Sequence, residues 1–180
     1  MERLINGMQK TTDKINLFAG FMASLTFACM SVIVILQVIS RSFLSYSFQW
    51  AEEMARYFFI WSTMLAATCA TYSHVHIGVD ILVSYLRGKT KRTVEILAYL
   101  FFIFALIVLL HYGGLQALQT VQSGQTATSF PVSAGLLFFS IPFNALLMLF
   151  ICVTQLMELL VHGQNRNVGT VKLNQAAVRE

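Results

Sequence analysis

The sequence predicts an all-α integral membrane protein with four transmembrane helices. Of its 180 residues, 57% are apolar and only 11% are charged, which is unusual for a soluble domain. Four apolar stretches approach or exceed the ~20 residues that carry a helix across ~30 Å of hydrocarbon, where only a helix satisfies its own backbone. The predicted spans cover about residues 17–40, 54–73, 94–118 and 134–161. We expect residues 1–162 to form one membrane domain and residues 163–180 a mobile cytoplasmic tail.

The positions of the basic residues predict the orientation of these helices. Lysine and arginine gather before the first span, between the second and third spans, and after the fourth, and only Arg41 and Arg56 lie elsewhere. Because basic residues stay on the cytoplasmic side, we expect both termini to be cytoplasmic and residues 41–56 and 121–133 to face outward. The net charge of +4 then reflects topology and anionic lipid, and no nucleic-acid partner is expected.

The first span is expected to be retained and to pack against another helix. It is too long for the h-region of a signal peptide and lacks a small-x-small exit. Small side chains recur along it at spacings of three and four residues, which lets a second helix approach closely. These residues are Ala19, Gly20, Ala23, Ser24 and Ala28. The segment 42–50 that follows is aromatic but interrupted by serine and glutamine, so we expect it to rest at the interface without spanning.

The start of the second helix carries three charges. Glu52 lies four residues and Glu53 three residues before Arg56, so either acid can pair with the arginine on a helix. One interpretation is a neutralised helix start at the outer interface. The other is a docking site for a second protein, because two acids and one base leave one charge without an internal partner. Further along this helix, small residues predict a groove for a neighbouring helix: Ser62, Ala66, Cys69, Ala70 and Ser73.

Residues 74–86 are predicted to continue the second helix along the inner interface. On a helix, His76, Asp80 and Ser84 share one polar stripe while isoleucine, valine and leucine cover much of the rest. The part from His74 to Asp80 also alternates polar and apolar residues, as a strand would. The membrane context favours the helix.

The last two spans contain isolated polar residues. Glu95 lies near the N-terminus of the third span, where the helix dipole favours an acid, and His111 is expected near the outer interface. Pro142 predicts a bend in the fourth span, and Asn144 requires a partner on a neighbouring helix. Glu158 is expected at the inner interface.

The sequence supports no catalytic, cofactor or metal site. It lacks the common phosphate-binding, zinc-protease and serine-hydrolase motifs, and Cys29, Cys69 and Cys152 have no ligand-like spacing, so they are interpreted as packing residues. A bis-histidine haem needs two imidazoles at similar depth, but His111 is expected near the outer face and the other three histidines near the inner one. No acidic or basic residue lies in the middle of a span, and no internal repeat is evident. Transport by this chain alone is therefore not expected.

One set of residues resembles a known family. Trp50, Glu52, Glu53, Arg56 and Trp61, followed by His76-Ile-Gly-Val-Asp80, resemble the pattern of the small membrane subunit of tripartite ATP-independent periplasmic (TRAP) transporters, the DctQ-type family. The resemblance covers about residues 15–160, including Pro131 and Pro142.

The resemblance implies a heterodimer in the bacterial inner membrane. The large subunit of such a pair carries the sodium and substrate sites and moves the substrate by an elevator-like motion, and a soluble periplasmic protein delivers an organic acid. The small subunit would enlarge the stationary scaffold. On this basis we expect Trp50, Glu52, Glu53, Arg56 and Trp61 to anchor an outer rim of the large-subunit interface, and His76 and Asp80 an inner rim. The alternatives are a self-sufficient exporter, a membrane assembly factor unrelated to transport, and a cytochrome-b-like subunit of another complex.

Overall fold

The chain folds into four long helices in the residues that the structure describes. The computed structural model describes residues 2–44, 48–73, 89–126 and 133–162. Its helices are α1 (Glu2–Leu44), α2 (Gln49–Tyr72), α4 (Lys89–Gln122) and α5 (Gly135–His162). Within these ranges the β-structure is a single isolated bridge between Thr126 and Ser133. The predicted all-α class is therefore confirmed for the described residues.

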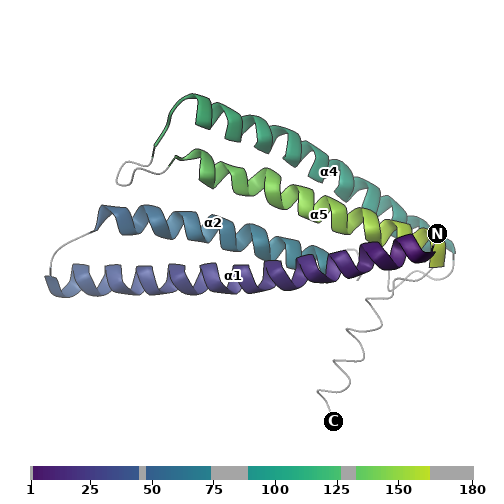
Figure 1. Ribbon diagram of the computed structural model, residues 1–180, viewed down its shortest axis with the longest axis horizontal. Helices are drawn as coiled ribbons and strands as arrows, with labels where there is room; N and C mark the ends of the chain where they lie inside the picture. Colours follow the sequence, from purple (N-terminus) through teal and green to yellow (C-terminus); the bar gives the residue numbers. More distant parts are fainter. Residues whose placement is uncertain (1, 45–47, 74–88, 127–132, 163–180) are drawn as a thin grey trace, which may run out of the picture.

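The helices form two antiparallel hairpins that lie side by side (Figure 1). α1 packs along α2, α4 packs along α5, and α2 joins the two hairpins by packing on α5; α1 makes a smaller contact with α5. The end of α1, the start of α2, the end of α4 and the start of α5 lie at one end of the bundle, which we call the hairpin end. The opposite end, which we call the terminal end, holds the N-terminus, the end of α2, the start of α4 and the end of α5. This alternation of direction is what the predicted topology requires.

Three of the four helices are long and apolar enough to cross a bilayer. They contribute the stretches Gly7–Phe43, Arg92–Gln122 and Gly135–Leu160. α2 has 24 residues, or about 36 Å at 1.5 Å per residue, which suffices in length. Its serines, threonines and alanines make it less apolar than the others.

The predicted interfacial segment 42–50 is shorter than expected. α1 continues through Leu44, and α2 begins at Gln49. The two helices therefore include both ends of the segment, and its position at the membrane interface stays a prediction. The physical reason is that residues 41–44 contain no proline or glycine, so the backbone hydrogen bonds of α1 continue beyond the predicted end of the span.

The contact between α4 and α5 is apolar and close. Leu106, Met148 and Cys152 form its buried cluster, which confirms the interpretation of Cys152 as a packing residue. A Cβ atom added at Gly113 would lie 2.7 Å from Cγ2 of Ile141, so the glycine is what lets α4 approach α5 at this level. α5 remains one helix through Pro142.

The contact between α2 and α5 is polar. Thr68, Ser140 and Asn144 are all fully buried. The Thr68 hydroxyl donates to Oδ1 of Asn144 at 3.1 Å, and Nδ2 of Asn144 donates to the carbonyl of Ser140 at 2.9 Å. The expected neighbour of Asn144 is thus Thr68 on α2.

Candidate partner-binding surface

The first turn of α2 presents an aromatic residue to the surroundings. Phe48 precedes the helix in an extended conformation and makes no side-chain cap hydrogen bond; its carbonyl accepts from the amide of Ala51 at 3.1 Å. Trp50 is 44% exposed, and its ring lies 5.9 Å from that of Phe48. An exposed tryptophan at a helix end suits the membrane interface, where one edge of the ring is wet.

The charges of this turn are paired within the chain. Nη2 of Arg56 lies 3.8 Å from Oε1 of Glu52, and both side chains are mostly exposed. Such a pair contributes little to stability, so both groups can exchange partners at low cost. Glu53 is half-buried and interacts electrostatically with Tyr57. The sequence argument from an unpartnered acid therefore does not apply to Glu53.

Trp61 lies on another side of α2. Its ring packs against Phe143 of α5, with 6.2 Å between the ring centroids. The structure thus brings Trp50, Glu52 and Arg56 together at the exposed start of α2 and turns Trp61 toward the neighbouring helix. His76 and Asp80, the predicted inner rim, lie outside the described residues.

The terminal end is held by contacts that the sequence did not reveal. Nε2 of Gln155 on α5 donates to the carbonyls of Thr71 and Tyr72 at 3.2 and 3.1 Å, at the last turn of α2. The hydroxyl of Tyr72 donates to Oδ1 of Asp13 on α1 at 2.7 Å. These donors and acceptors are 59 to 84 residues apart, and only polar residues near helix ends hint at them.

Arg92 has a structural contact besides its expected topological role. Its Nη2 donates to the carbonyl of Leu160 at 2.9 Å and to that of Leu159 at 3.3 Å. These are carbonyls of the last turn of α5, which have no amide partner within their own helix. Arg92 thereby ties the start of α4 to the end of α5. Glu158, predicted at the inner interface, is buried beside this contact.

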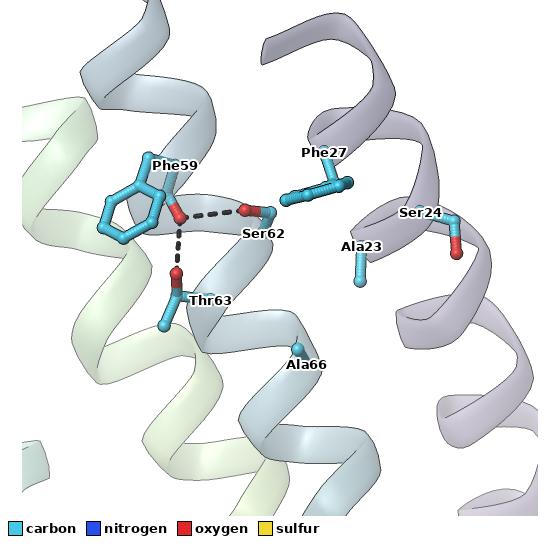
Figure 2. A pocket seen from close by; sticks show the side chains of 7 residues that line it. All are labelled: Ala23, Ser24, Phe27, Phe59, Ser62, Thr63 and Ala66. Atoms are coloured by element: carbon cyan, nitrogen blue, oxygen red, sulfur yellow. Dashed lines mark hydrogen bonds between the residues drawn. The ribbon is translucent and has the colours of Figure 1, made fainter. Parts of the chain in front are cut away.

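A groove lies between α1 and α2 (Figure 2). It has a volume of about 410 Å³, and its walls carry small residues and phenylalanine: Ala23, Ser24 and Phe27 from α1 and Ser62, Thr63 and Ala66 from α2. The hydroxyls of Ser62 and Thr63 both donate to the carbonyl of Phe59, at 2.9 and 2.8 Å. Ser24 donates to the carbonyl of Gly20 at 2.9 Å. All three hydroxyl protons are therefore used inside their own helices.

Among the described residues, no group of three or more histidine, cysteine, aspartate or glutamate side chains is placed to hold a metal ion. What the surface offers is shape, exposed aromatic area and one exchangeable ion pair.

Comparison with known proteins decides the family. Residues 30–162 match the family described as "Tripartite ATP-independent periplasmic transporters, DctQ component". The chain belongs to the DctQ family. The resemblance seen in the sequence is thereby confirmed.

A curated relative of this DctQ-family chain is the sialic acid TRAP transporter permease protein SiaT of Haemophilus influenzae (strain 86-028NP). The two are 25% identical over 142 residues, which is 76% of this chain but only 22% of that relative. The chain thus spans about a fifth of the relative's length. Membership of the DctQ family makes this chain a membrane component of a transporter rather than an enzyme.

Proposed function

We propose that this DctQ-family chain is the small permease subunit of a sodium-coupled, binding-protein-dependent transporter for an organic acid, and that it acts as a membrane scaffold for a large transport subunit. The observation that carries the scaffold role is the absence of charged residues from the long central stretch of each helix. Residues 15–40, 57–73, 96–122 and 135–157 contain no aspartate, glutamate, lysine or arginine. A carrier needs polar or ionisable groups near the middle of the bilayer, so the ion and substrate sites belong to a partner.

The relative's length supports a large partner. The region similar to this chain makes up 22% of the SiaT permease, so most of that polypeptide lies outside the match. In our proposal, a separate large subunit takes the place of that remaining part of the relative and carries the ion and substrate sites. Sialic acid is an organic acid, and we carry over only that class of substrate.

The proposed topology has four spans in the bacterial inner membrane with both termini cytoplasmic. α2 is the second of these spans and the one outside the three long apolar stretches, and its position alongside the long apolar helix α1 supports a spanning role (Figure 1). The hairpin end is then the outer end and the terminal end the inner end. A soluble periplasmic binding protein would meet the outer connections, residues 41–53 and 121–133.

The proposed large-subunit interface keeps the residues expected from the sequence, with one refinement. Trp50, Glu52 and Arg56 supply the exposed outer rim. Glu53 and Trp61 support it from within the chain, since Trp61 packs on α5. His76 and Asp80 stay proposed inner-rim residues.

Reconstitution tests this function. Proteoliposomes with the chain, its large subunit and the matching binding protein are expected to take up the organic acid only with an inward sodium gradient. Vesicles with the chain alone are expected to take up none. Uptake by the chain alone, or full uptake by the large subunit without it, would overturn the scaffold role. Uptake of equal rate without sodium would overturn the coupling.

A further inference from the structure

The exposed face of α2 is one straight stripe. From Ala51 to Tyr72, every residue of α2 that is exposed falls on it, at successive spacings of four, three, four, three and four: Glu52, Arg56, Phe59, Thr63, Ala66 and Ala70. A spacing that averages 3.5 residues keeps one side of a helix facing a partner helix along its whole length in a left-handed pair. We call these six residues the α2 seam.

The α2 seam differs in composition from the exposed faces of the other helices. Those faces carry large apolar side chains such as Phe21 of α1, which is 64% exposed, Phe101 of α4 at 74%, and Phe139 of α5 at 53%. They offer the area that lipid tails cover. Beyond Phe59 the α2 seam offers threonine and alanine, which give lipid little to cover but let another backbone come close. This composition is also why α2 contributes none of the three long apolar stretches.

The groove beside the seam has the shape and polarity that a helix needs. Thr63 and Ala66 belong both to the seam and to the groove wall, and α1 supplies the opposite wall through Ala23 and Phe27 (Figure 2). The hydroxyl protons of the groove are already donated to carbonyls of their own helices. A group that binds there is therefore recognised by complementary shape and not by accepting hydrogen bonds. Apolar ridges of a transmembrane helix fit this description.

We propose that one transmembrane helix of the large subunit lies along the α2 seam and fills the groove between α1 and α2. This rests on the proposed function. The occupant is a protein helix because the seam repeats at helix-pairing spacing and because the SiaT relative continues, beyond its matching 22%, as one permease polypeptide. The seam also includes the exposed ion pair of Glu52 and Arg56. Its charges can interact with a polar residue of the large-subunit helix at the membrane surface.

Bulky substitutions in the seam test the proposal. Ala66→Phe and Ala70→Phe are compared with Ala105→Phe, which changes an exposed alanine of α4 in the same way. We expect the two seam variants to lower co-purification of the tagged large subunit by about tenfold or more, because overpacking a close helix contact is costly. Ala105→Phe and the conservative Ala66→Ser are expected to leave it unchanged. The thermal unfolding midpoint of each isolated small subunit checks that it folds.

A photocrosslinking amino acid provides a second measurement that does not depend on disrupting the contact. Placed at Ala66, it is expected to form an adduct with the large subunit. Placed at Phe101 of α4, which is 74% exposed, it is expected to form none. Adducts at Ala66 with lipid alone, or equal capture of the large subunit at both positions, would overturn the seam.

The two failures are distinguishable. If the unchanged chain does not co-purify with the large subunit, the proposed function fails. If it does, but Ala66→Phe and Ala70→Phe co-purify equally well, only the seam fails.

Discussion

α5 packs mainly against two helices, α4 and α2, and it meets them by different means. Toward α4 it presents Met148 and Cys152 to Leu106, with Gly113 allowing close approach. Toward α2 it presents buried Asn144 and Gln155, each with a hydrogen-bond partner on α2. In a bilayer, lipid tails are as apolar as the side chains that they cover, so no hydrophobic driving force brings helices together. Helix association depends instead on close packing and on hydrogen bonds. The α4–α5 contact uses the first and the α2–α5 contact the second.

This difference has a consequence for specificity. A packed apolar contact depends on the volumes that meet in it, because an added side chain at Gly113 would occupy the place of Ile141. A hydrogen bond such as that from Thr68 to Asn144 fixes one register, since a shift of one turn separates donor from acceptor. We therefore expect α4–α5 to be sensitive to volume and α2–α5 to be sensitive to the loss of single polar atoms.

The largest expected effect is in the packed contact. Gly113→Leu places side-chain atoms where Ile141 already lies, so the free energy of unfolding in detergent should fall by about 1–3 kcal/mol. Gly114→Leu is the matched control, because a Cβ there meets no atom within 4 Å. Equal effects of the two substitutions would show that the close approach at Gly113 is unimportant.

The next effect is in the polar contact. Gln155→Leu keeps the volume but removes the donor to the carbonyls of Thr71 and Tyr72, so stability should fall by about 1 kcal/mol. Hydrogen exchange of the last turn of α2 should rise as well. Gln119→Leu, at an exposed position of α4, should change neither quantity. Unchanged exchange at the end of α2 in Gln155→Leu would refute the capping role.

A smaller effect is expected where α1 meets α2. Tyr72→Phe removes only the hydroxyl that donates to Asp13, at a site that water reaches, so the loss should be about 0.5 kcal/mol. Tyr112→Phe provides the control, because Tyr112 is 66% exposed on α4. Thermal unfolding of both variants in the same detergent gives the comparison, and a larger loss in Tyr112→Phe would contradict it.

The smallest effect on stability is expected at the hairpin end. Glu52→Gln breaks an exposed pair with 3.8 Å between its atoms, so the free energy of unfolding should change by less than about 0.5 kcal/mol. Binding to the large subunit should weaken all the same, since the α2 seam begins at this residue. A pull-down at low and high salt measures this, and binding that is equal to that of the unchanged chain at both salt concentrations would remove Glu52 from the interface.

The sequence predicted the helices well because each is a local pattern. Long apolar runs and the spacing of basic residues give the class, the order and the approximate spans of the four helices. The family pattern from Trp50 to Asp80 gave the DctQ family, which residues 30–162 confirm. The full length of α1 could not be predicted from its apolar run, because helical hydrogen bonding continues through polar and aromatic residues on both sides of the predicted span.

The long-range contacts could not be predicted in the same way. Trp61 was expected at the rim from the family resemblance, and only the packing of α2 on α5 brings it to Phe143. Arg92 was interpreted through its charge alone, because its bonds to Leu159 and Leu160 span 67 and 68 residues. The α2 seam could not be recognised from the sequence, because a buried helix face has the same residue spacing as an exposed one. The exposure of each residue in the fold distinguishes the two.

The dependence of the end of α2 on Gln155 sets an order of assembly. A chain made from its N-terminus completes α2 more than 80 residues before Gln155 is synthesised, so the carbonyls of Thr71 and Tyr72 gain the side-chain donor of Gln155 only when the last helix inserts. α2 is also the helix that lipid favours least. Biogenesis of this protein is therefore complete only when α5 arrives, and a ribosome-stalled or truncated chain lacking α5 should keep α2 accessible to proteases or chaperones.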